Sequence, residues 1–199
     1  MTVEVAELAP GLWRWTAPHP AWTPADADDW DRDVGCVYAE IDGAIVTVDP
    51  LVPAEPRERD RFWRALDRDV ERFGAPLVVT TVSDHIRSAA ALVERYGAAD
   101  RTVDDVVGLE AIATARFEEV VVWLEPHRAL VAGDVLLGDS AGSVRLCPED
   151  WCEGLDHDAV RASLRQLLEL PVKRILVSHG EPVVTDGLVA LTCALRDER

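Results

Sequence analysis

The sequence contains no stretch of about 18 uninterrupted apolar residues, so no membrane-spanning helix is predicted. Its first residues, MTVEVAELAPGLW, lack a basic start followed by an apolar segment, so no signal peptide is predicted either. Basic residues are outnumbered, with 20 Lys and Arg against 37 Asp and Glu and a net charge of −17. Such a charge repels phosphate backbones, which argues against nucleic-acid binding. The cytoplasm is the expected compartment.

Cysteine shows no sign of a disulfide framework or a zinc finger. There are four Cys and no CxxC, and no Cys or His pair stands near Cys147 and Cys152 at zinc-finger spacing. In a reducing cytoplasm we expect the thiols to stay free. No repeat, low-complexity segment or long linker interrupts the chain. Its length suits a single domain, residues 1–199, made of two pseudo-halves of about 1–108 and 109–199.

Apolar patterns and turn residues predict strands and helices in mixed order. Residues 3–15 predict two strands joined by a Pro-Gly turn, and residues 36–50 a hairpin that turns at Asp42-Gly43. The further expected elements are a helix over 57–73, a strand over 77–81, a helix over about 87–96 ended by Gly97, a hairpin of 118–124 and 128–133, a helix from Asp156 to about 170, a strand over 174–177 and a last helix from near Asp186. The fold class is therefore α/β, with helices covering two packed mixed sheets.

Three polar residues follow predicted strands. His85 lies in SDHI, His179 in VSHGE, and Asp134 follows a Gly in LVAGDVLLG, where the backbone can approach closely. Polar residues at three strand ends suggest one common rim. Together with Asp84 they form a ligand set suited to zinc, iron or manganese.

Five stretches together resemble the metallo-β-lactamase fold superfamily. They occur in the family's order, cover nearly the whole chain, and read APGLWRW, CVYAEIDGAIVTVDP, VVTTVSDHIRSAAALVERYGA, WLEPHRALVAGDVLLG and RILVSHGEP. The resemblance implies a four-layer αββα sandwich of two mixed sheets with a one- or two-metal site at one sheet edge. It also implies hydrolysis of an ester, thioester, lactone, lactam or phosphodiester.

The family signature H-x-H-x-D-H is incomplete here. Thr80 and Val82 replace both leading His, and counting back from Asp134 to the family's next ligand position lands near Ala115, with no His close. The resemblance therefore implies a divergent member whose first metal pocket has no ligand of its own. The second pocket is complete, with the implied ligands Asp84, His85, Asp134 and His179.

Three functions stay open at this point. The first is a mononuclear hydrolase of a small ester, thioester or lactone, in which one divalent ion lowers the pKa of a water from 15.7 towards about 7 to 9 and Asp84 acts as catalytic base. The second is a metal-free relative that binds a small apolar ligand or performs non-hydrolytic chemistry. The third is a structural or partner-binding domain, in which Asp84 simply caps a helix and the other ligands are relics.

Several residues are expected around the pocket. Thr80 could donate a hydrogen bond to substrate, Trp22 and Trp30 lie in an acidic loop, and His157 opens a helix. The Trp residues could equally pack a core or anchor a lid. The expected partner is a small molecule with an apolar part, and nothing indicates an oligomeric state. Asp49 is expected to be structural and His127, in the EPHR turn, to be exposed.

Overall fold

A computed structural model of the chain describes residues 3–98, 102–116, 118–139, 142–152 and 154–196. The chain forms two compact units. The first unit is Met1–Thr80 with Asp84–Gly108, and the second is Thr81–Ser83 with Leu109–Arg199. Each unit contains helices and a mixed sheet, with parallel and antiparallel strand pairs, so the α/β class is confirmed.

The first unit is built on a five-stranded sheet in the order β1-β2-β3-β4-β5. Neighbours from β1 to β4 pair antiparallel, and β5 pairs with β4 in parallel. The predicted turn is confirmed, since Asp42 and Gly43 both have positive φ, 49° and 72°, as a type I′ turn requires. The strands are β1 (Glu4–Ala9), β2 (Leu12–Pro18), β3 (Asp33–Ile41), β4 (Ala44–Val48) and β5 (Leu77–Val79).

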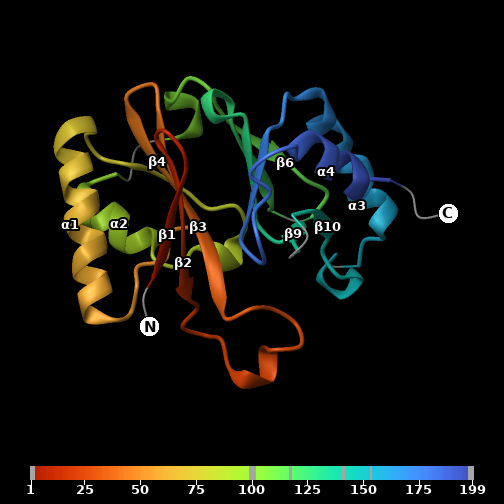
Figure 1. Ribbon diagram of the computed structural model, residues 1–199, viewed down its shortest axis with the longest axis horizontal. Coiled ribbons are helices and arrows are strands. Elements are labelled where there is room, and N and C mark those ends of the chain that lie inside the picture. The colour runs from red at the N-terminus through yellow and green to blue at the C-terminus, as the bar shows by residue number, and fades with distance from the viewer. Residues whose placement is uncertain (1–2, 99–101, 117, 140–141, 153, 197–199) are drawn as a thin grey trace. The chain divides into compact units, whose positions relative to one another are not determined.

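Two helices cover one face of this sheet, α1 (Pro56–Phe73) and α2 (Ala89–Tyr96), as Figure 1 shows. Leu66 of α1 and Leu92 of α2 share a buried cluster with Ile45 of β4. Apolar burial therefore holds both helices against the sheet. Because α1 lies between β4 and β5 in the chain, it makes the crossover that parallel pairing requires.

The helix ends follow local sequence. Pro56 occupies the first position of α1, and the Glu55 side chain accepts a hydrogen bond from the Glu58 backbone N at 2.9 Å. Gly97 ends α2 in the left-handed conformation, with a φ of 67°. Both ends agree with the predicted helix limits to within two residues.

The second unit contains a four-stranded sheet in the order β11-β8-β7-β6 and a two-stranded ribbon, β10-β9. β11 pairs with β8 in parallel, and the remaining neighbours pair antiparallel. The strands are β6 (Leu109–Ala113), β7 (Val120–Leu124), β8 (Ala129–Ala132), β9 (Leu136–Gly138), β10 (Val144–Leu146) and β11 (Arg174–Val177).

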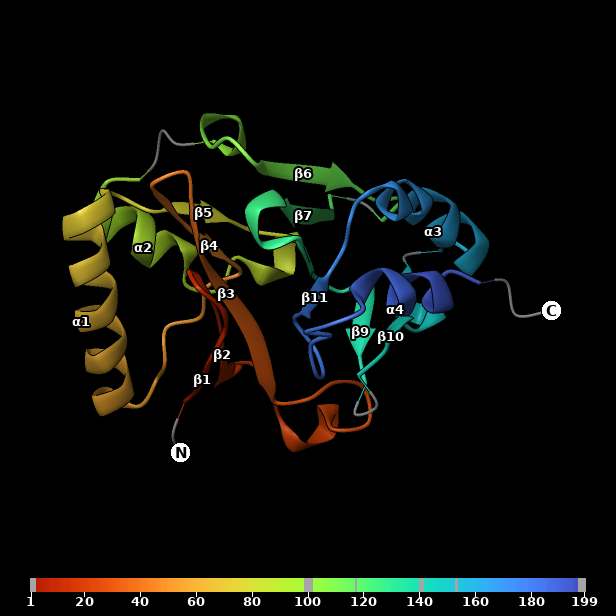
Figure 2. The ribbon, with the colours of Figure 1, turned by 45° about the horizontal axis from the view of Figure 1, so that its top comes forward.

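Helices α3 (His157–Leu164) and α4 (Gly187–Ala194) accompany these strands (Figure 2). Val160 of α3 and Leu191 of α4 join Ile175 of β11 in the buried core of the unit. The short 3₁₀ turns of the chain are η1 (Pro24–Asp26), η2 (Ser83–His85), η3 (Val103–Asp105), η4 (Glu125–His127), η5 (Glu149–Cys152) and η6 (Arg165–Glu169). None of the helices in the described ranges is long and apolar enough to cross a membrane.

Most predicted elements are confirmed, with shifted ends. The strand expected over 77–81 ends at Val79, and the helix expected from about 87 begins at Ala89. Arg87 has a φ of 40°, outside the right-handed helical region, so the helix cannot begin there. The short strands β6, β9 and β10 were not predicted. The expectation of free thiols is confirmed, with Cys193 exposed and Cys36, Cys147 and Cys152 buried.

The prediction that His127 is exposed is wrong. The residue ends η4 and is 8% exposed. Arg174 Nη1 donates to the His127 backbone oxygen at 2.9 Å, and the backbone N of Lys173 donates to the Arg128 oxygen at 2.8 Å. These bonds tie the backbone of the turn to Arg174 of β11 and to its neighbour Lys173, and the residue is buried.

Two glycines mark a close backbone approach in the second unit. The Gly138 backbone N donates to the His179 oxygen at 3.0 Å. A Cβ at position 138 would collide with the backbone of Glu181, and a Cβ at Gly180 would collide with the Gly138 carbonyl. The segment that carries His179 can therefore lie against β9 only without side chains at these positions.

We expect Gly138→Ala to lower the free energy of unfolding by about 3 kcal/mol, because the added methyl group has no space. Urea unfolding followed by circular dichroism measures the loss. Gly142→Ala is the matched control, since a Cβ there meets nothing within 4 Å and only its φ of 72° opposes the change. The control should lose about 1 to 2 kcal/mol. Equal losses in both variants would contradict the close-approach explanation.

Candidate metal centre

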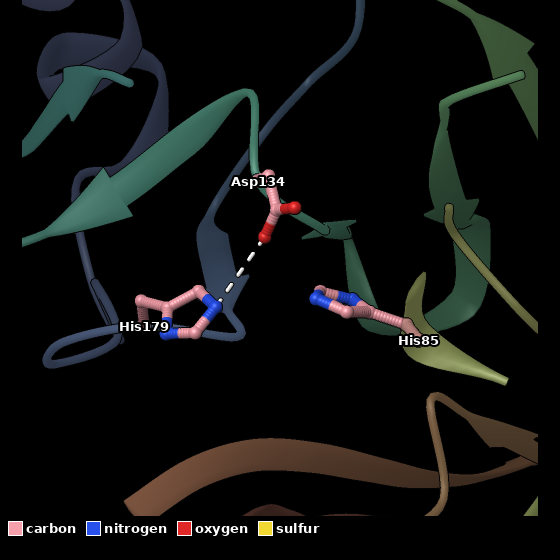
Figure 3. Close-up of side chains that lie close together, drawn as sticks. All are labelled: His85, Asp134 and His179. Atoms are coloured by element: carbon pink, nitrogen blue, oxygen red, sulfur yellow. Dashed lines mark ion pairs between the residues drawn. The ribbon is translucent and has the colours of Figure 1, made fainter. Parts of the chain in front are cut away.

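Two neighbouring strands of the second unit lead to Asp134 and His179. β8 and β11 are parallel, with Ala132 opposite Val177, so their carboxyl ends lie at the same edge of the sheet. Asp134 and His179 each follow that strand pair by two residues. His179 Nε2 lies 3.3 Å from Asp134 Oδ1, the interaction drawn as a dashed line in Figure 3. The strand register thus brings a carboxylate and an imidazole together.

This pair is largely removed from solvent. The side chain of His179 is 10% exposed and that of Asp134 is 14% exposed. The Trp151 ring packs edge-on against His179, with ring centroids 5.8 Å apart. Because so little water screens these groups, charge interactions at the pair are stronger than at the surface.

A buried carboxylate holds Asp134 in place. Glu119 Oε1 accepts hydrogen bonds from the backbone N of Asp134 and of Val135, both at 2.8 Å. Glu119 Oε2 accepts from Arg116 Nη1, which also lies 3.9 Å from Asp134 Oδ2. Burial raises the pKa of Glu119 to about 7, against the opposing effect of the Arg116 charge. When Glu119 is ionised, two carboxylates and one guanidinium leave a net negative charge, which favours a bound cation.

The first unit contains a second Asp–His pair. His85 Nδ1 lies 3.0 Å from Asp49 Oδ2, and both side chains are almost fully buried. Asp49 follows β4, its backbone N donates to the Val79 oxygen at 2.9 Å, and Arg87 Nη1 donates to its oxygen at 3.1 Å. Because an ionised Asp49 only accepts hydrogen bonds, Nδ1 carries the proton and Nε2 is the nitrogen that can ligate a metal.

Among the described residues, Asp134 and His179 of the second unit are side chains that could ligate a metal ion, and in the first unit His85 offers an imidazole nitrogen; Figure 3 draws all three. Imidazole nitrogens and carboxylate oxygens, as in the Asp134–His179 pair, suit a borderline divalent ion such as zinc, iron or manganese. Catalytic zinc sites commonly use three protein ligands and keep a position for water. The donor set therefore fits a divalent metal ion.

Two other residues predicted at this site have different surroundings. Asp84 is exposed in η2 and is not one of these three side chains. Its roles as ligand and base stay predictions. Thr80 follows β5 in the first unit and is half-buried. Its contact with substrate is likewise a prediction.

The aromatic and His residues predicted to border the pocket make local contacts. Trp22 Nε1 donates to the Trp30 backbone oxygen at 3.1 Å, and the His19 ring packs against Trp30 with centroids 5.3 Å apart. Trp30 also packs against the buried cluster of the first unit, so it anchors the loop between β2 and β3 to the sheet. His157 Nε2 lies 2.8 Å from the Cys147 backbone oxygen. Substrate binding by Trp22, Trp30 and His157 stays a prediction.

The sequence interpretation missed Arg116 and Glu119. Counting back from Asp134 led to Ala115, which is exposed, whereas its neighbour Arg116 is 7% exposed. An Arg and a Glu three residues apart usually form a weak surface pair. The one available signal was their position immediately before β7, since a charged pair so close to a buried strand has little room to reach solvent.

No protein-family model matches the chain, and the search of curated proteins found no match. Solved structures do match. A metallo-β-lactamase from Pontibacter korlensis superposes with a TM-score of 0.58 at 16% identity, over 99% of this chain and 100% of that one. The DIM-1 metallo-β-lactamase superposes with a TM-score of 0.62 at 13% identity, over 98% of this chain and 96% of that one. The chain has the metallo-β-lactamase fold. Identities this low establish the fold alone.

Within this metallo-β-lactamase fold, Asp49 can be tested apart from any metal. We expect Asp49→Ala to lower the free energy of unfolding by about 2 kcal/mol, because the buried Nδ1–H of His85 loses its acceptor. Thermal and urea unfolding of the metal-free protein measure the change. Asp49→Asn is the matched control, because its amide oxygen can still accept this bond and the loss should be smaller. An Asp49→Ala variant as stable as the wild type would contradict the assignment.

Proposed function

We propose that the chain is a mononuclear metal-dependent hydrolase of a small ester, thioester or lactone. The observation that supports this most is the nearly buried Asp134–His179 pair, 3.3 Å apart beyond the parallel strands β8 and β11. His85 is the third ligand proposed, through Nε2, because Asp49 engages Nδ1. Asp84, which precedes His85 in the chain, is proposed as a further ligand or as the base.

A bound divalent ion would supply a water of lowered pKa and polarise a substrate carbonyl. The protein's own groups would do the remaining work. Glu119 holds the backbone of Asp134, and Asp49 orients His85. The exposed carboxylate of Asp84 would accept a proton from the attacking water. The low exposure of Asp134 and His179 would limit competition from bulk water.

The proposed substrate is small and has an apolar part. Ile86, directly after His85, is 54% exposed and offers an apolar contact surface. The net charge of −17 argues against a polyanionic substrate. The residues proposed to contact substrate are Thr80, Trp22, Trp30 and His157. We place the reaction in the cytoplasm because Cys147 and Cys152 are free thiols with Sγ atoms 3.5 Å apart, a pair that a reducing compartment keeps open.

Metal content tests this proposal directly. Protein purified without chelator and supplied with zinc should contain about one divalent ion per chain by elemental analysis. Asp134→Asn and His179→Gln should each reduce metal affinity at least about tenfold, because each removes a ligand. Asp158→Asn and His157→Gln are the matched controls and should retain the ion. The metal-loaded protein should hydrolyse a panel of small esters, thioesters or lactones, and chelation should stop the reaction.

Two results would overturn the proposal. One is a wild-type protein that takes up no stoichiometric metal from zinc, iron or manganese solutions. The other is an Asp134→Asn variant that binds metal as tightly as the Asp158→Asn control.

A second candidate function, binding of a neutral apolar ligand, is favoured by a cavity inside the first unit. The cavity has a volume of about 420 Å³ and lies between the sheet and α1. Aromatic rings form its walls, with Trp13 5.4 Å from Tyr38 and Trp15 5.6 Å from Phe62 between centroids. This size and lining suit a flat apolar molecule.

The charged residues around the cavity indicate the charge of such a ligand. Three acidic and three basic side chains line it, so their formal charges cancel and an uncharged ligand is expected: Glu40, Glu58, Asp69, Arg61, Arg68 and Arg72. Burial and the nearby Asp69 and Glu40 charges raise the pKa of Tyr38, so its hydroxyl stays neutral. A hydrogen-bonding group on the ligand could meet that hydroxyl.

Cavity binding is tested by filling the cavity. Neutral fused-ring aromatic compounds should raise the melting temperature of the wild type in a concentration-dependent way. Ala65→Trp, which places an indole in the cavity, should abolish the rise. Ala90→Trp, on the exposed side of α2, is the matched control and should keep it. A rise of the same size in Ala65→Trp would show that the compounds bind elsewhere.

A further inference from the structure

Arg116 and Glu119 form a buried charged pair that none of the proposed ligand roles explains. They lie between β6 and β7, where the Thr114 backbone N donates to the Glu119 oxygen at 3.0 Å and the Arg116 backbone N donates to Thr114 Oγ1 at 3.1 Å. Arg116 is 7% exposed and Glu119 is 1% exposed. Burying two such charges costs several kcal/mol in hydration, so their position calls for a compensating role.

Glu119 positions the loop of Asp134 but does not by itself require an arginine. Its Oε1 is used by the backbone N of Asp134 and of Val135, and a neutral Gln oxygen could accept the same two bonds. Among the described residues, Arg116 Nε is buried without a hydrogen-bond partner. The guanidinium therefore leaves one buried hydrogen-bond donor without a partner. Its positive charge is the other property that can account for its position.

The two oxygens of Asp134 face different partners. Oδ1 lies 3.3 Å from His179 Nε2, whereas Oδ2 lies 3.9 Å from Arg116 Nη1. We propose that Arg116 is a fixed cation that occupies the Oδ2 side of Asp134, leaving Oδ1 for a single metal ion. In this role it replaces a second metal ion and makes Asp134 a ligand through one oxygen. That the ion at Oδ1 is a divalent metal rests on the proposed function. The arrangement of the charges of Arg116, Glu119 and Asp134 does not depend on it.

Elementary electrostatics sets the direction of the effect. A positive charge held beside Oδ2 repels an ion at Oδ1, while the Glu119 charge attracts it. With Glu119 kept ionised, or replaced by Gln in both proteins compared, removing Arg116 should therefore strengthen metal binding, and neutralising Glu119 alone should weaken it. A purely structural role of the pair predicts the opposite for Arg116, because loosening the loop would weaken binding in both variants.

The test compares metal affinity by isothermal titration calorimetry with zinc and by the absorption spectrum of the cobalt form. Arg116→Met should bind about tenfold more tightly than the wild type, and Glu119→Gln about tenfold less tightly. Arg116→Lys keeps the charge and should stay within about threefold of the wild type. An Arg116→Met variant that folds but binds metal equally or more weakly at a pH where Glu119 is ionised in both proteins would overturn the inference.

Two further comparisons keep the outcome decisive. If Arg116→Met does not fold, the double variant Arg116→Met with Glu119→Gln removes both charges and should bind about tenfold more tightly than Glu119→Gln alone. Equal affinity in those two would overturn the inference. If the wild type binds no metal, the proposed function fails, whereas the inference still requires that Arg116→Met acquire metal binding. A metal-free Arg116→Met would then overturn the inference as well.

Discussion

The two hydrogen bonds that Glu119 accepts from the backbone of Asp134 and Val135 organise the second unit's part of the candidate centre. Without that carboxylate, two N–H groups would be buried unpaired, at about 1 to 3 kcal/mol each. The other oxygen of the same carboxylate, Oε2, accepts a hydrogen bond from Arg116 Nη1. The position of Glu119 also explains the glycine at position 133, because a Cβ there would press on Thr81 Oγ1 and Glu119 Oε1. The buried Glu119 side chain thus restricts which residues can lie beside it.

In both units a pair of parallel strands brings a carboxylate close to an imidazole. In the first unit, β4 and β5 are parallel and lead to Asp49 and His85, 3.0 Å apart. In the second, β8 and β11 are parallel and lead to Asp134 and His179, 3.3 Å apart. Parallel neighbours present their carboxyl ends at one edge, so residues distant in sequence can meet there. The reactive groups of each unit therefore lie beyond its parallel pair, within otherwise antiparallel surroundings.

The sequence predicted well those features that local chemistry determines. Asp42-Gly43 specifies its turn through two positive φ angles, and Gly97 ends its helix for the same reason. The three-residue strands β9 and β10 are too short to show a periodicity, so they were not predicted. The backbone of the His127 turn is hydrogen-bonded by Arg174 of β11, 47 residues later in the chain, and no local pattern carries that information.

The candidate site was predictable to a similar extent. The sequence predicted Asp84, His85, Asp134 and His179 as ligands; within the second unit the structure brings Asp134 and His179 together, and the ligand roles stay predictions. Arg116 and Glu119 could not be predicted, because their burial depends on the packing of β7 and β8 rather than on their neighbours in sequence. The aromatic cavity of the first unit was not predicted, because it needs Phe62 of α1 beside Trp13 and Trp15 of β2, and local sequence does not show that contact.

The register of β8 against β11 has a consequence for how such chains can diverge. Ala132 of β8 and Val177 of β11 are paired in the sheet. Asp134 and His179 lie close together because each follows its member of this pair by two residues. The segment connecting them contributes nothing to that count, so insertions or deletions between β10 and α3 that keep Trp151 against His179 would leave the register of the pair unchanged. A single residue gained or lost between either strand and its polar residue would instead turn that side chain away from its partner. Homologous sequences should therefore be aligned from these two short intervals outward, with length variation assigned to the connection.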